Sequence, residues 1–135
     1  NRSEYRKTER NRLIIDAYNA NLSSMHAALQ SFAQTEDAHK MMILGDMREL
    51  GTASADAHAE VLQLALATGS QQVWLVGSEF AQALTTLSAD KKVIFRTFPD
   101  VEAVKAELEA QPLNDQLILI KGSNGTRLFQ LPELL

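Results

Sequence analysis

The sequence predicts an α/β domain with a doubly wound, mostly parallel sheet of about five to six strands and helices on both faces. Short runs of apolar residues recur along the chain, and segments with the apolar spacing of amphipathic helices separate them. Strands that are apolar throughout are typical of parallel sheets buried on both sides. Alternating strands and helices imply right-handed crossovers. The 135 residues, 45% of them hydrophobic, suit one domain with a sizeable core.

The first half of the chain contains two pairs of a strand and a helix. They are a strand at 13–15, a helix at 22–34, a strand at 41–44 and a helix at 54–68. Met25, Leu29 and Phe32 recur at helical spacing, so they are expected to form the buried face of the first helix. Gly69 is expected to end the second helix, because glycine readily adopts the left-handed conformation that follows many helices.

The second half continues the alternation. The expected elements are a strand at 73–76, a short helix at 78–87, a strand at 93–95, a helix at 100–110, a strand at 117–120 and a last short helix near 125–131. Pro132 is expected to end that helix. Trp74 and Phe95 lie within strand runs and are expected in the core. The polar residues 1–10 are interpreted as an interdomain linker, and residues 11–135 as the folded domain.

The composition argues against several classes of partner. The formal net charge is −4, whereas nucleic-acid binding requires a basic face. No run of 18 apolar residues occurs, so neither a nucleic-acid nor a membrane partner is expected. The sequence has no cysteine, which excludes disulfides and thiolate metal sites. The chain begins with Asn1 rather than methionine, and we expect it to be a piece of a longer protein.

Polar residues follow the predicted strands at the places where doubly wound sheets bind ligands. They lie in residues 16–21 after the first strand, with Asp16, Asn19 and Asn21, in residues 46–49 after the second, with Asp46, and in residues 121–124 after the last, with Lys121 and Ser123. Asp16 offers an acceptor for ribose hydroxyls, and Lys121 offers a positive charge for a carboxylate or phosphate. Ser123 and the amides near it suit an anion. The alternative for Asp16, Asn21 and Ser123 is that they only cap helices and turns.

Two signals of a complete active site are absent from the sequence. There is no G-x-x-x-x-G-K-[ST] loop, and residues 121–123 (KGS) reverse the order of glycine and lysine that such a loop needs. If ATP is used, another part of the protein must hold its phosphates. His26, His39 and His58 are not spaced as metal ligands, so no metal site is expected in this chain.

Three segments together resemble the carboxyl-terminal domain of the Mur ligase family. Residues 13–21 (LIIDAYNAN) resemble a D-x-Y-N-A-N-P signature, residues 44–51 (LGDMRELG) resemble L-G-D-M-x-E-L-G, and residues 121–123 resemble K-G-S. His58 matches a histidine that usually follows the second segment. The segments occur in the family's order and spacing over nearly the whole chain. Leu22 stands where the family usually has proline, which changes the start of a helix but removes no side-chain ligand.

The resemblance is strongest to the Mur ligases that add D-alanyl-D-alanine, and it implies the Rossmann-like third domain of a three-domain enzyme. In that enzyme the first domain binds UDP-MurNAc-tripeptide, and the central domain holds ATP and the Mg²⁺ ligands. The enzyme makes an acyl phosphate from the tripeptide, and the dipeptide amine attacks it, in the bacterial cytoplasm during peptidoglycan synthesis. No catalytic residue is expected in this domain, and the isolated chain is expected to be inactive.

The resemblance also assigns residues to two kinds of contact. Those matching nucleotide-binding positions are Arg2, Asp16, Tyr18 and Asn19, and those matching substrate-binding positions are Asn21, Asp46, Lys121 and Ser123. On this assignment a lysine and a serine face the carboxylate of the incoming dipeptide. The domain closes over the nucleotide while it positions that dipeptide.

Two other classes of function remain as alternatives. A receiver-like signalling module also has an aspartate after its first strand and a lysine after its fifth, but it needs a phosphorylatable aspartate after its third. Residues 77–79 (GSE) occupy that place, and Gly122 rather than proline follows Lys121. Phosphorylation by a small phosphodonor would identify such a module. A purely structural or oligomerisation domain would bind neither nucleotide nor dipeptide.

Overall fold

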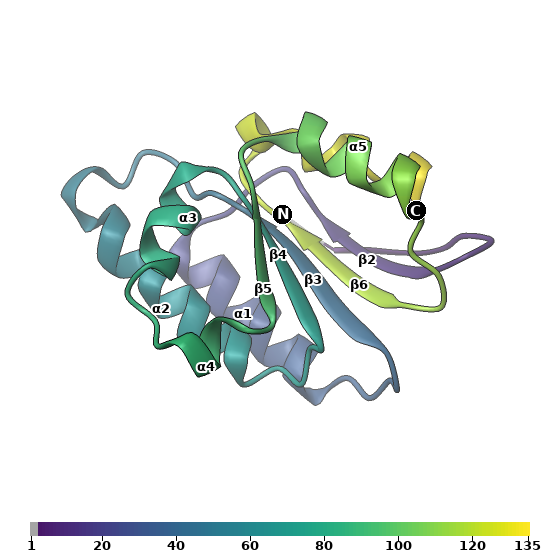
Figure 1. The fold of residues 1–135 in the computed structure, drawn as a ribbon, viewed down its shortest axis with the longest axis horizontal. Coiled ribbons are helices and arrows are strands. Elements are labelled where there is room, and N and C mark those ends of the chain that lie inside the picture. Colours follow the sequence, from purple (N-terminus) through teal and green to yellow (C-terminus); the bar gives the residue numbers. More distant parts are fainter. Residues whose placement is uncertain (1–2) are drawn as a thin grey trace.

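Six strands form a single sheet in the computed structural model, which describes residues 3–135. The strands are β1 (Glu4–Lys7), β2 (Arg12–Asp16), β3 (Lys40–Gly45), β4 (Gln72–Val76), β5 (Phe95–Phe98) and β6 (Leu117–Lys121). Their order across the sheet is β1-β2-β6-β3-β4-β5 (Figure 1). β1 is antiparallel to β2, and the other neighbouring pairs are parallel. The predicted doubly wound, mostly parallel sheet is therefore confirmed.

The helices cover both faces of this sheet. The elements between the strands are α1 (Leu22–Gln34), η1 (Gly51–Ala53), α2 (Ser54–Leu66), α3 (Ser78–Leu84), α4 (Ala89–Lys92) and α5 (Val101–Ala110). From β2 to β5 the chain crosses the sheet in one direction, so α1, α2 and α3 lie on one face. α5 returns the chain to β6 and lies on the other face (Figure 1).

The apolar runs supply both cores because alternate side chains of a strand point to opposite faces. In β6, Leu117 and Leu119 belong to the core under α1 and α2, whereas Ile118 and Ile120 belong to the core under α5. This alternation explains why the predicted strands are apolar at consecutive positions. The expected face of α1 is confirmed, because Met25, Leu29 and Phe32 are all buried.

The largest differences from the sequence prediction lie in the second half of the chain, and the helix expected at 54–68 ends slightly early, at Leu66. The strand expected at 93–95 begins instead at Phe95, because Ala89–Lys92 forms α4 and leaves Val93 80% exposed. α3 ends at Leu84 rather than at 87. The last helix is replaced by three 3₁₀ turns, η2 (Asn124–Thr126), η3 (Leu128–Gln130) and η4 (Pro132–Leu134). Arg127 lies between the first two turns with a left-handed φ of 60°, which interrupts helical hydrogen bonding.

The segment interpreted as a linker contributes a strand to the sheet edge. Glu4–Lys7 pairs with β2, and all four side chains are exposed, which is why the segment gives no apolar signal. Its role as a connection between domains stays a prediction. Asn1 and Arg2 lie outside the described residues, and so does the expected nucleotide contact of Arg2.

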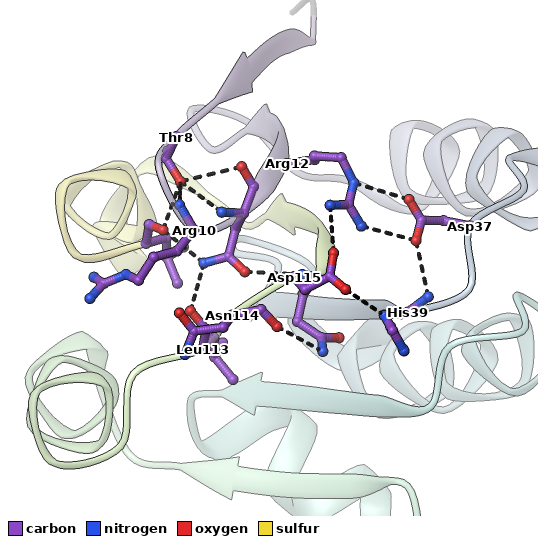
Figure 2. A network of polar contacts seen from close by, with 11 residues as sticks. Thr8, Arg10, Arg12, Asp37, His39, Leu113, Asn114 and Asp115 are labelled. Atoms are coloured by element: carbon purple, nitrogen blue, oxygen red, sulfur yellow. Dashed lines mark hydrogen bonds and ion pairs between the residues drawn. The ribbon is translucent and has the colours of Figure 1, made fainter.

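A network of polar contacts links the loops at the amino-terminal ends of β2, β3 and β6 (Figure 2). The predicted site lies at the opposite ends of these strands. The Arg12 guanidinium donates to both carboxylate oxygens of Asp37, at 3.0 and 3.1 Å, and to Asp115 at 3.0 Å. The Asn11 amide donates to the carbonyl oxygens of Leu113 and Leu135. The network joins the β1–β2 turn to the loops before β3 and β6, so its role is structural.

Asp37 makes this network sensitive to acid. Its pKa lies below the ordinary 3.8, first because the backbone amide of His39 donates to its carboxylate and then because of Arg12. A carboxylate with a lowered folded pKa stabilises the fold above its unfolded pKa, and the contribution is lost as the pH falls through the folded pKa. We expect Asp37→Asn to have a lower urea midpoint than the natural chain near pH 6. The difference between the two midpoints should narrow toward about pH 2. A gap of equal size at both pH values would contradict this cause.

Candidate functional site

The carboxyl end of β6 is the point at which the sheet reverses its winding. β6 lies between β2 and β3, whose chains continue to α1 and α2 on one face, whereas the chain after β6 continues on the face of α5. Ligands bind at such points in open α/β sheets. Lys121 is in register with Asp16 of β2 and with Leu44 of β3, so the three predicted motif segments meet here.

Lys121 and Asp16 form a buried ion pair at this point. The Lys121 ammonium donates to Asp16 Oδ2 at 2.7 Å and to the Asn19 carbonyl oxygen at 3.1 Å. The Lys121 side chain is 1% exposed, and the Asp16 side chain is 15% exposed. Asp16 Oδ1 has no hydrogen bond within residues 3–135. The lysine expected to meet a ligand is thus occupied inside the fold, while one oxygen of Asp16 is left to accept.

Asn21 and Asp46 both act as caps in this structure. The Asn21 side chain accepts from the Ser24 amide at 2.8 Å and starts α1 with a capping box. Asp46 accepts from the amides of Glu79 and Phe80, each at 2.9 Å, and so caps α3 from a neighbouring strand. Gly77 precedes α3 with φ of 121°, and a Cβ atom there would collide with the Asp46 carboxylate. For Asn21 the hydrogen bonds thus show the helix cap that the sequence offered as its alternative role.

An aromatic pair lies beyond the end of β2. Tyr18 is 65% exposed and stacks on Phe129 with ring centroids 5.6 Å apart and an angle of 11° between the planes. Asn19 next to it is also exposed. Phe129 was missed by sequence reasoning, because nothing in the spacing of residues 111 positions apart indicates a contact.

The loop after β3 is held by a buried histidine. His58 in α2 has no exposed surface, and its Nε2 accepts from the Met47 amide at 3.0 Å. Its Nδ1 donates to the Ser54 carbonyl oxygen at 2.8 Å, so these two partners fix the neutral Nδ1–H tautomer. The His58 ring packs nearly perpendicular to the Phe80 ring, with the ring centroids 4.6 Å apart. The buried ring therefore packs inside the fold and also holds the backbone of the motif loop after β3.

The loops after β3 and β6 leave two groups without partners. The Ser123 hydroxyl is buried in a residue that is 8% exposed, and it has no hydrogen bond among the described residues. Arg48 is exposed and forms no ion pair within that part of the chain. Arg48 lines a hollow of 460 Å³ between the loop after β3 and α3, and a second of 290 Å³ toward Gly125 and Arg127. The sequence places Arg48 in the candidate segment 46–49 but assigns it no role of its own, since it occupies the variable position of its motif.

Neither a metal centre nor a membrane segment is found in the described chain. Within residues 3–135 no group of three or more histidine or carboxylate side chains is placed to hold a metal ion. Over the same residues no helix has the length and apolar character needed to cross a bilayer.

Comparison with known proteins identifies the family. A family model described as "Mur ligase, glutamate ligase domain" matches residues 1–124. The chain is 37% identical over 123 residues to UDP-N-acetylmuramoyl-tripeptide–D-alanyl-D-alanine ligase of Treponema pallidum, and 33% identical over 121 residues to the ligase of that name from Escherichia coli. These alignments cover 90% and 88% of this chain but 27% and 25% of the relatives. The chain therefore spans roughly a quarter of the length of these relatives.

Solved structures agree with this result. MurF from Acinetobacter baumannii has a TM-score of 0.76 at 28% identity, over 95% of this chain and 28% of that one. MurF ligase from Thermotoga maritima in complex with ADP has a TM-score of 0.75 at 19% identity, over 96% and 29%, which shows a shared fold. The chain thus belongs to the Mur ligase family as its carboxyl-terminal domain, and it resembles the members that act in peptidoglycan precursor synthesis by joining D-alanyl-D-alanine.

Proposed function

We propose that this chain is the carboxyl-terminal domain of an ATP-dependent amide ligase that adds D-alanyl-D-alanine to UDP-MurNAc-tripeptide. The observation that carries the proposal is the meeting of three motif segments at adjacent strand ends. Residues 16–21, 44–51 and 121–123 follow or end β2, β3 and β6, which are neighbours in the sheet. The reaction that we propose is the one for which the relatives are named.

In the proposed reaction the terminal carboxylate of the tripeptide takes the γ-phosphoryl group of ATP, and ADP is released. The amine of D-alanyl-D-alanine then attacks the acyl carbon, phosphate leaves and an amide forms. ATP would supply the phosphoryl group and Mg²⁺ would neutralise charge on its oxygens, and the main ligands of both are assigned to the central domain. The work of this chain is to position the partners, which converts a bimolecular attack into one within a complex.

The assigned residues fit this positioning role. We assign Asp16 Oδ1 and the exposed Tyr18 ring to the nucleotide together with Asn19, and Arg2 is the further predicted contact. On the acceptor side the unsatisfied Ser123 hydroxyl is the group that a ligand would satisfy, because a buried hydroxyl without a partner is costly.

The other assigned acceptor residues support the site from within. Lys121 holds the loop after β2, Asn21 starts α1, and Asp46 fixes α3 beneath the loop after β3. Catalysis requires the amino-terminal and central domains, so the isolated chain is expected to be inactive. The reaction is assigned to the bacterial cytoplasm, with no nucleic-acid or membrane partner.

A panel of acceptors tests the proposal. The full-length protein that contains this chain is incubated with ATP, Mg²⁺ and UDP-MurNAc-tripeptide. The acceptor is D-alanyl-D-alanine, D-alanine or D-glutamate, and the products are identified by mass spectrometry. We expect an amide product with the dipeptide alone. A product with D-glutamate instead would reassign the chain to a different Mur ligase. No ligation, together with phosphorylation of the chain by a small phosphodonor, would favour the signalling module.

A further inference from the structure

We infer that Arg48 binds the free carboxylate of the acceptor substrate, an inference that rests on the proposed function. An acceptor with a carboxylate calls for a cation at the carboxyl edge of the sheet. The lysine expected there, Lys121, is buried and already pairs with Asp16. Among the described residues that line the two hollows, the basic side chains are Arg48 and Arg127, and Arg48 alone lines both.

Within the described chain, none of the acidic side chains that line the two hollows forms an ion pair with Arg48. Asp46 accepts from the α3 amides, Glu79 accepts from the Ser54 hydroxyl, and Asp100 caps α5 through the Ala103 amide. Glu102 pairs with Lys105. Glu49 is the exposed neighbour of Arg48 in sequence, and it forms no ion pair with Arg48 in the described structure. Among the described residues the guanidinium therefore has no ion-pair partner and is available to a ligand.

The position of the Arg48 guanidinium is defined by Gly125. A Cβ atom on Gly125 would lie 3.2 Å from Arg48 Cζ, 3.4 Å from Nη2 and 3.5 Å from Nε, so the guanidinium packs directly over this glycine. Gly125 follows Ser123 by two residues in the turn after β6. The cation is thus placed at the same turn as the unsatisfied serine hydroxyl.

The backbone just before Arg48 is held at two residues. The Asp46 carbonyl oxygen accepts from the Ser123 amide at 3.4 Å, which joins the loops after β3 and β6. The Met47 amide, one residue before Arg48, donates to the buried His58 ring. A planar guanidinium held in this way matches the geometry of a carboxylate with two parallel hydrogen bonds.

A nucleotide phosphate would offer similar anionic chemistry, so the test separates the two ligands. In the full-length protein, Arg48→Gln is compared with Lys91→Gln, which removes the same charge from an exposed residue of α4 before β5, away from the site. Acceptors are D-alanyl-D-alanine and the same dipeptide with its carboxylate replaced by a carboxamide. KM for ATP and kcat/KM for each acceptor are measured.

We expect the natural protein and Lys91→Gln to prefer the carboxylate acceptor by about 10- to 100-fold, the range of a charge-assisted hydrogen bond. Arg48→Gln should lose most of that preference while its KM for ATP is unchanged. An undiminished preference in Arg48→Gln would overturn the inference, and a raised KM for ATP with intact preference would assign Arg48 to the nucleotide. Failure of the natural protein to use either acceptor would instead overturn the proposed function.

Discussion

Replacing Asp16 with asparagine is expected to destabilise the chain by about 3–5 kcal/mol, because it leaves the Lys121 ammonium buried without a counter-charge. Lys121 is 1% exposed, and its remaining partner is the Asn19 carbonyl oxygen at 3.1 Å. The same change should lower turnover of the full-length ligase roughly 10- to 1,000-fold, since a site contact is lost. Urea unfolding of the chain and initial rates of the ligase are the measurements.

A double variant separates the two effects of Asp16. Asp16→Asn with Lys121→Met removes both charges, so much of the lost stability should return, since neither charge remains buried alone. Turnover should not return, because both side chains of the proposed site are missing. If the single variant unfolds within about 0.5 kcal/mol of the natural chain, the pair does not hold the site together.

Replacing Lys40 with methionine is the second large effect, with an expected loss of about 3 kcal/mol from unsatisfied buried carbonyl groups. The Lys40 ammonium donates to the carbonyl oxygens of Phe32 at 2.6 Å, Thr35 at 2.8 Å and Thr68 at 2.7 Å. These oxygens belong to the carboxyl ends of α1 and α2, and burial lowers the pKa of Lys40. Methionine keeps the apolar stem and removes the donors.

Lys91→Met is the matched control for Lys40, because Lys91 is exposed on α4. Its free energy of unfolding in urea should stay within about 0.5 kcal/mol of that of the natural chain. In the full-length ligase, Lys40→Met and Lys91→Met should have the same KM for D-alanyl-D-alanine, since Lys40 lies at the start of β3, away from the proposed site. A loss below about 1 kcal/mol in Lys40→Met would show that water replaces the ammonium at these carbonyls.

Most of the fold could be predicted from the sequence, because β2, β3, β4 and β6 each contain a short apolar run. β5, with the sequence FRTF, lacks such a run, and its start was misplaced. α1 was placed at 22–34 and forms there, with Asn21 as its cap. β1 could not be found, since its four side chains are all exposed and its pairing depends on β2. The prediction of a last helix near 125–131 was wrong, because Arg127 adopts a left-handed conformation that the periodic pattern does not reveal.

The place of the candidate site was easier to predict than the state of its residues. Strand ends alone indicate that Asp16, Asp46 and Lys121 come together, because parallel strands end at one edge. Which charges pair there depends on register across the sheet, and β2 and β6 are about 100 residues apart in sequence. The pairing of Lys121, the lack of an ion pair for Arg48 within residues 3–135 and the contact of His58 with Met47 therefore emerge only in three dimensions.

The most direct test of the account is phosphate release from ATP by the full-length protein. Mg²⁺, UDP-MurNAc-tripeptide and D-alanyl-D-alanine are supplied together, and each is then omitted in turn. We predict that sustained release needs all of them, as expected of a ligase whose carboxyl-terminal domain delivers the dipeptide. Release that does not depend on D-alanyl-D-alanine, from protein shown to be folded, would contradict the assignment of the β6 edge as an acceptor site.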